Sequence, residues 1–183
     1  EVMVGAVLTQ NTAWHNVKQA IANLKKAQLL TPEGIHHLPP ETLADLIRPS
    51  GYYHVKARRL QNLVALVMAG GGGDPPRILD EPLADLRQAL LSVNGIGPET
   101  ADSILLYAAG HPIFVIDAYT RRILARHCLA SESDSYDQLQ ALFMDHLPRQ
   151  TPLYNEYHAL LVHLGHVYCK PNPLCPDCPL NNI

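Results

Sequence analysis

Apolar residues in this chain recur every three or four positions, which is the spacing that places side chains on one face of an α-helix. No segment alternates apolar and polar residues as a half-buried strand does. The sequence therefore predicts an all-α protein. The repeated pattern is seen at Val17, Ala20, Ile21 and Leu24, at Leu60, Leu63, Val64 and Val67, and at Leu153, Tyr157, Leu160, Leu161 and Leu164.

Most of the predicted helices are short, and several begin at a proline, which suits the first helical turn. Examples are Pro32, Pro40 and Pro82. Residues 70–73 are four glycines, followed by Asp74 and two prolines. Because four glycines do not hold a helix and prolines restart the chain in an extended form, this segment predicts a linker between helices.

Composition describes a packed globular chain of 183 residues, with 47% hydrophobic and 17% charged residues, that needs no disulfides to fold. It lacks both an uninterrupted apolar stretch of about 18 residues and a secretory signal pattern, so we expect no membrane association and no export from the cell. An apolar helical pattern follows Glu1 almost at once, so we expect some N-terminal structure to be missing.

The formal net charge of −3 gives no support to nucleic-acid binding, because DNA-binding proteins usually present a basic face. Positive side chains do gather locally, for example at Lys56, Arg58 and Arg59. Such clusters are explained as well by solvated helix faces as by contact with a polyanion.

Residues 91–101 contain a Gly95-Ile96-Gly97-Pro98 turn between two helical patterns. The glycines permit a tight turn and close approach of the backbone, and Pro98 begins the next helix. The exposed amides at that helix start would form a phosphate site. An ordinary corner between two helices would have the same glycines.

Three of the four cysteines, Cys169, Cys175 and Cys178, have the spacing Cys-x5-Cys-x2-Cys, with prolines among them. Thiolates this close together in an intracellular chain favour a metal site over disulfides, and both zinc and iron–sulfur centres use them. Three ligands are one short of the usual four. Cys128 lies far upstream and is read as an ordinary thiol.

Residues 91–101 resemble the helix-hairpin-helix of the endonuclease III superfamily, and the resemblance extends over essentially the whole chain. Asp117, which follows the apolar run 113–116, lies at the position of the catalytic aspartate in that family. The segment around Gln10 resembles the one whose glutamine enters the gap left by a flipped base. Pro49-Ser50-Gly51-Tyr52-Tyr53 resembles the loop that wedges the opposite strand, and Tyr52 is the wedge candidate.

This resemblance implies two helical domains, residues 1–111 with the hairpin at about 80–111, and residues 112–183 ending in the cysteine loop, with double-stranded DNA bound in the cleft between them. It also implies a monomer, which in a bacterium would be cytoplasmic and associated with the nucleoid. The hairpin residues Gly95, Ile96, Gly97 and Thr100 would contact the DNA backbone. The cysteine loop would hold a [4Fe–4S] cluster rather than zinc, with a fourth cysteine just beyond Ile183, so we expect that the chain is cut there.

The resemblance implies that Asp117 stabilises the positive charge that develops on the sugar when an N-glycosidic bond breaks. On its own, an aspartate after an apolar run is better explained as a helix N-cap. Bifunctional members carry a lysine where this chain has Glu99, and a carboxylate forms no imine, so we expect a monofunctional glycosylase with weak or no lyase activity. The resemblance places Gly5 at the position of the catalytic glutamate in the mismatched-adenine branch, which argues against that branch.

Within the superfamily, the segments around Gln10, Tyr52 and the hairpin look most like the 3-methyladenine glycosylases of endonuclease III type. The resemblance implies a damaged alkylated purine as substrate, with Trp14 as the stacking residue and His166 as a possible pocket residue. A core tryptophan and an ordinary packing histidine are the alternatives. Two other functions stay open: a glycosylase for oxidised or deaminated bases, and a non-catalytic lesion-binding iron–sulfur protein.

Overall fold

The computed structural model describes residues 1–181, and in this range it contains eleven α-helices, two short 3-10 helices and no strand. The all-α prediction is confirmed. The chain divides into two compact units, residues 1–109 and residues 110–183. No helix in the described range is long and apolar enough to cross a membrane.

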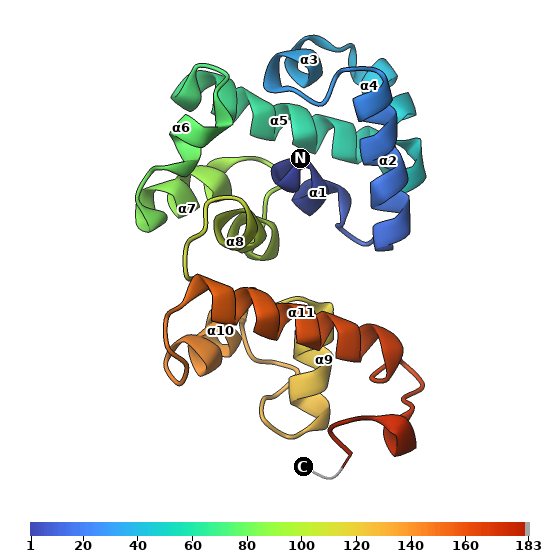
Figure 1. Ribbon diagram of the computed structural model, residues 1–183, viewed down its shortest axis with the longest axis vertical. Coiled ribbons are helices and arrows are strands. Elements are labelled where there is room, and N and C mark those ends of the chain that lie inside the picture. The colour runs from blue at the N-terminus through green and yellow to red at the C-terminus, as the bar shows by residue number, and fades with distance from the viewer. Residues whose placement is uncertain (182–183) are drawn as a thin grey trace. The chain divides into compact units, whose positions relative to one another are not determined.

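The first unit is built around the long helix α5 (Tyr53–Gly71), against which α1, α3, α4, α6 and α7 pack (Figure 1). Its core consists of fully buried aliphatic side chains, among them Leu8, Leu24, Leu43, Leu60 and Leu90. The other elements are α1 (Val2–Leu8), α2 (Trp14–Lys26), α3 (Pro32–His37), α4 (Pro40–Leu46), η1 (Arg48–Ser50), α6 (Pro75–Leu79), α7 (Leu83–Ser92) and α8 (Pro98–Tyr107).

The glycine-rich segment differs from the predicted linker. Helix α5 continues through Gly70 and Gly71 and ends only at Gly72, whose φ of 62° lies in the left-handed region. Pro75 then begins helix α6 instead of restarting an extended chain. The prediction was wrong at both ends, because packing of α5 and α6 outweighs the intrinsic cost of glycine in a helix and because proline is accepted in a first helical turn.

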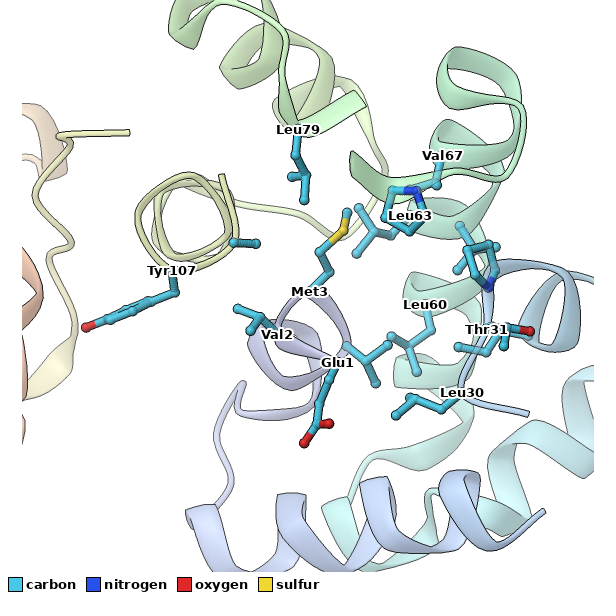
Figure 2. Close-up of a pocket in the computed structure, with 16 residues that line it drawn as sticks. Glu1, Val2, Met3, Leu30, Thr31, Leu60, Leu63, Val67, Leu79 and Tyr107 are labelled. Carbon is cyan, nitrogen blue, oxygen red and sulfur yellow. The ribbon is translucent and has the colours of Figure 1, made fainter. Parts of the chain in front are cut away.

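An apolar cavity of the first unit measures about 300 Å³ and is lined by residues of α1, α3, α5, α6 and α8. Figure 2 shows the side chains of Met3 and Leu63 facing this space, while the ring of Tyr107 points away from it. Glu1 is its single acidic lining residue, and it pairs with Lys25 across 2.5 Å. The cavity therefore lacks the convergent polar groups that a catalytic site requires.

The second unit contains α9 (Ala118–Arg126), α10 (Tyr136–Met144), α11 (Thr151–Val167) and η2 (Cys175–Asp177). Helices α9 and α11 lie side by side (Figure 1). A Cβ on Gly165 of α11 would lie 2.5 Å from Cδ1 of Tyr119, so the glycine permits this close approach. The apolar run 113–116 is a buried, non-helical segment that leads into α9, and Phe114 stacks on Phe143 at 3.9 Å between ring centroids.

Candidate active site

The turn between α7 and α8 requires glycine at its first position. Gly95 has a φ of 93°, and a Cβ there would lie 2.3 Å from Cγ of Arg59, which crosses the turn from α5. Asn62, also on α5, donates a 3.1 Å hydrogen bond to the carbonyl of Asn94. Gly97 differs, because its φ is −93° and nothing lies within 4 Å of an added Cβ. Gly95 thus shapes the turn, whereas Gly97 leaves the start of α8 open.

A buried ion pair connects the two helices of this hairpin. Arg87 of α7 donates from Nε and Nη2 to the two carboxylate oxygens of Asp102 of α8, at 2.8 and 3.2 Å. Asp102 is fully buried. A bidentate pair in this setting restricts the relative orientation of two helices strongly, because breaking it leaves a buried charge without its partner.

The hairpin residues expected to contact DNA lie at different depths. Gly97 and Glu99 are exposed, and Glu99 lies in the first turn of α8. Ile96 and Thr100 are buried. A contact of Thr100 with a phosphate therefore has to use the backbone amide rather than the side chain, whereas the amide of Ile96 already donates to the carbonyl of Val93 at 3.0 Å.

The side chain of Gln10 joins the segment after α1 to the hairpin. Its Nε2 donates to Oγ1 of Thr100 at 2.8 Å and to the carbonyl of Gly95 at 3.2 Å. Nη1 of Arg59 donates a short hydrogen bond to its Oε1. The structure therefore brings two sequence-predicted elements, the glutamine and the hairpin, into direct contact.

Two aromatic candidates project from the first unit. Tyr52 is 73% exposed and has a left-handed φ of 46°, directly after Gly51 with a φ of 66°. A bulky residue in this region is strained and persists only where its surroundings hold it. Trp14 is 56% exposed, so it is not a core residue, and its ring lies over Gly5, where an added Cβ would be 3.6 Å from Cη2.

Asp117 is the N-cap of α9 in the second unit. Its Oδ1 accepts a 2.7 Å hydrogen bond from the backbone N–H of Thr120, and its side chain is 13% exposed. The second carboxylate oxygen, Oδ2, lies 3.7 Å from Nε2 of His158. Asp117 is thus a helix N-cap, and the capping bond leaves its second carboxylate oxygen facing the imidazole of His158.

The electrostatics of this pair follow from burial. Burial lowers the pKa of the His158 imidazole below its ordinary value, and the negative charge of Asp117 opposes the shift without cancelling it. The imidazole is therefore mostly neutral at pH 7. A neutral histidine leaves the negative charge of the neighbouring carboxylate uncompensated, which is what stabilisation of a developing cation needs.

The sequence offered His166 as a possible pocket residue, with an ordinary packing or surface role as the alternative. His166 is exposed, and the histidine beside Asp117 is His158. The helical spacing of buried residues in α11 is a sequence signal that could have identified His158. His158 lies four residues after Tyr154 and three before Leu161, so it occupies the apolar face of α11, where the structure buries all three side chains.

Two arginines of α9 hold the beginning of the cysteine loop. Arg122 donates from Nε to the carbonyl of Cys169 at 2.6 Å and from Nη2 to that of Gly165 at 3.1 Å. Arg126 donates from Nη1 toward Sγ of Cys169 at 3.4 Å and from Nη2 to the carbonyl of Pro171 at 2.9 Å. These contacts fix the path by which the chain leaves α11.

The cysteines of the predicted metal site line one cavity of about 190 Å³, formed by Cys169, Cys175 and Cys178 together with Arg126 and His127. Within residues 1–181, however, no three His, Cys, Asp or Glu side chains converge tightly enough to hold a metal ion. The geometry therefore gives a thiol-lined cavity and not a formed ion site. Cys128 is a free, exposed thiol.

Comparison with known proteins defines the class. Residues 4–149 match the model of the HhH-GPD superfamily base excision DNA repair proteins. The protein named "Putative DNA repair glycosylase MJ1434" of Methanocaldococcus jannaschii is 44% identical over 184 residues, which cover all of this chain and 84% of that protein.

Two solved structures have the same fold. A trapped endonuclease III–DNA covalent intermediate superposes with a TM-score of 0.84 at 26% identity, over 98% of this chain and 80% of that one. The H. pylori 3-methyladenine DNA glycosylase MagIII, bound to 1,N6-ethenoadenine, gives a TM-score of 0.77 at 31% identity, over 90% and 83% of the two chains. The fold is that of endonuclease III. The chain belongs to the HhH-GPD superfamily of base excision repair glycosylases.

Proposed function

We propose that this protein is a monofunctional DNA glycosylase that binds double-stranded DNA, flips out a damaged base and hydrolyses its N-glycosidic bond. The observation that carries the proposal is the position of Asp117, whose carboxylate is held by the first turn of α9 and lies next to a neutral histidine. A carboxylate fixed in this way can stabilise an oxocarbenium-like sugar without reorienting during the reaction.

DNA binding is assigned to the hairpin and to the loops that carry Gln10 and Tyr52. The exposed turn at Gly97 and the start of α8 suit a phosphate group. Gln10 and the exposed ring of Tyr52 would fill the space that a flipped nucleotide leaves, which lowers the cost of unstacking.

Water is the proposed nucleophile, because Glu99 stands where bifunctional relatives have lysine. Glu99 is exposed in the first turn of α8, and a carboxylate cannot form the imine on which the lyase reaction depends. The released product would then be an intact abasic site, with strand breaks appearing only after alkali.

An alkylated purine such as 3-methyladenine is the favoured substrate. Two observations support it: the likeness to MagIII and the exposed ring of Trp14, which could stack on a positively charged base. The second candidate is an oxidised or deaminated base, favoured by 31% identity to endonuclease III of Thermotoga maritima. A lesion-binding protein without catalysis is the third. It accounts for the cap that Asp117 forms on α9 but gives no role to the second carboxylate oxygen beside a neutral histidine.

A [4Fe–4S] cluster is the proposed cofactor, held by Cys169, Cys175 and Cys178, and zinc is the less favoured occupant. The support is the donor chemistry, because three thiols line one cavity next to a guanidinium that suits an anionic cluster. When bound, the cluster would hold the loop that follows α11. Arg122 and Arg126 would orient Cys169 and the adjoining backbone.

The deciding experiment is single-turnover release of 3-methyladenine from alkylated duplex DNA by the wild-type chain and by Asp117→Asn. Asparagine keeps the cap, because its side-chain oxygen can accept the same hydrogen bond from Thr120. We expect release that needs Asp117, with strand breaks only after alkali. No release by a wild-type protein that still binds DNA would contradict the alkylpurine assignment, and oxidised and deaminated duplexes would then be tested.

A further inference from the structure

Lys56 is buried, although the sequence placed it in a cluster of cations for which a solvated helix face and contact with a polyanion were equally good explanations. Only 1% of its surface is exposed. Its Nζ donates to the carbonyl of Leu8 at 2.8 Å, to Oγ1 of Thr12 at 2.7 Å and to the carbonyl of Ser50 at 2.7 Å. An ammonium group has three N–H donors, so these contacts use all of them.

The three acceptors belong to two different loops. Leu8 and Thr12 bracket the segment that contains Gln10, whereas Ser50 directly precedes Gly51 and Tyr52. Oγ1 of Thr12 also donates a short hydrogen bond to the carbonyl of Ser50, which closes the cluster. A single side chain from α5 thus connects both loops.

This arrangement is costly, because no carboxylate is among the acceptors of the buried ammonium group. The partners are two carbonyls at the ends of α1 and η1 and one hydroxyl. Burial, with a smaller effect of the charge of Arg59, lowers the pKa of Lys56 to about 8. A methionine of similar length would fill the same space without this cost, so packing alone does not account for a lysine here.

The backbone next to Ser50 needs support as well. Gly51 and Tyr52 both have positive φ, and a tyrosine in the left-handed region reverts to an extended conformation unless its neighbours prevent it. The bond from Nζ to the Ser50 carbonyl holds the residue immediately before this pair.

We propose that Lys56 is a positioning residue that fixes the Gln10 loop and the Tyr52 loop relative to each other, so that both enter the DNA together at the lesion. This inference rests on the proposed function. It adds a residue that contacts neither the base nor the sugar but determines whether damaged DNA is distinguished from intact DNA.

The test uses binding to a duplex with a tetrahydrofuran abasic-site analogue, which needs neither catalysis nor the correct lesion. For each variant, the dissociation constants for this duplex and for the undamaged duplex are compared, with 2-aminopurine fluorescence opposite the site as a measure of base displacement. Thermal unfolding is recorded in parallel. The variant is Lys56→Met, and the matched control is Lys26→Met, which changes an exposed lysine of α2.

We expect Lys56→Met to lower the preference for the abasic duplex at least about tenfold and to reduce the 2-aminopurine signal, because hydrogen bonds to a charged group are lost. Lys26→Met should keep the wild-type preference within about twofold. Thr12→Val, which removes one acceptor, should give an intermediate loss, and Lys56→Arg should recover part of it.

A Lys56→Met protein that keeps the wild-type preference overturns the inference and leaves the proposed function intact. A wild-type protein that does not prefer the abasic duplex overturns both. Should Lys56→Met fail to fold, Thr12→Val decides: full preference with a lowered melting temperature would show a merely structural role and contradict the proposal.

Discussion

Nε2 of His158 lies 3.7 Å from Oδ2 of Asp117, so the proposed catalytic carboxylate has a buried titratable neighbour on the adjacent helix. Because burial lowers the pKa of His158, the imidazole is neutral at pH 7 and gains a proton only as the pH falls below about 6.5, the ordinary histidine value. A protonated His158 would then offset the charge of Asp117. We expect the single-turnover rate constant of base release to fall below that pH.

The variant His158→Gln tests this pH dependence, because glutamine does not titrate. The acidic decrease of the rate constant should disappear or move to lower pH, whereas His163→Gln, at an exposed position of the same helix, should keep it. Profiles measured between pH 5 and 8 decide the matter. An unchanged acidic limb in His158→Gln would assign the decrease to another group.

The same shift predicts a change in stability. Because its pKa is lowered in the folded protein, His158 binds a proton at higher pH in the unfolded chain than in the folded one. The contribution of this group to the free energy of unfolding is therefore highest above about pH 6.5 and decreases as the pH falls below that value. Denaturant unfolding at pH 7.5 and 5.5 should therefore show a smaller difference for His158→Gln than for the wild type. Equal differences would contradict a lowered pKa.

The two hairpin glycines should respond differently to alanine. Gly95→Ala forces a Cβ onto a backbone with φ of 93° and to within 2.3 Å of the Arg59 side chain, so we expect destabilisation of about 1–3 kcal/mol. Gly97→Ala meets no atom within 4 Å and should leave stability almost unchanged while weakening binding to duplex DNA. Denaturant unfolding and a DNA titration measure the two effects. The prediction fails if Gly97→Ala binds DNA as the wild type does.

Glu99→Lys should introduce the missing amine. If the first turn of α8 faces the sugar, the lysine variant will be trapped on abasic DNA by borohydride, whereas the wild-type protein will not. Glu132→Lys, at an exposed site in the second unit, controls for added positive charge. Trapping of the wild type in good yield would instead contradict the monofunctional assignment.

Removal of one thiol from the cavity should abolish iron binding. We expect Cys175→Ser to lose iron and acid-labile sulfide, whereas Cys128→Ser, which changes a free cysteine outside the cavity, keeps both. Elemental analysis of the purified proteins measures this. Zinc in place of iron, or equal iron content in both variants, would overturn the cluster assignment.

Local patterns predicted the helices and the hairpin because the signals, apolar spacing and Gly-Ile-Gly-Pro, are contained in a few consecutive residues. Features that depend on tertiary packing could not be predicted from these local patterns. The extension of α5 through Gly70 and Gly71 depends on its neighbours in space, and the burial of Lys56 depends on acceptors up to 48 residues away.

In the candidate site, too, single residues could be predicted from the sequence, whereas the contacts between them could not. The resemblance to a family named Gln10 and Asp117, but nothing in it indicated that Gln10 bonds to the hairpin at Thr100. Likewise, His158 is one of ten histidines, and only the packing of α9 on α11 brings it to Asp117.

The hydrogen bonds of Gln10 have a mechanical consequence for lesion search. A side chain attached to Gly95, Thr100 and Arg59 cannot advance or withdraw without the hairpin. If the hairpin binds the sugar-phosphate backbone as proposed, its position would set how deeply Gln10 reaches into the DNA double helix. A side chain held at a fixed depth would enter the DNA only where base pairing and stacking are weak enough to open. The protein would then recognise a lesion first by the low energy needed to open the base pair, before the base itself is bound.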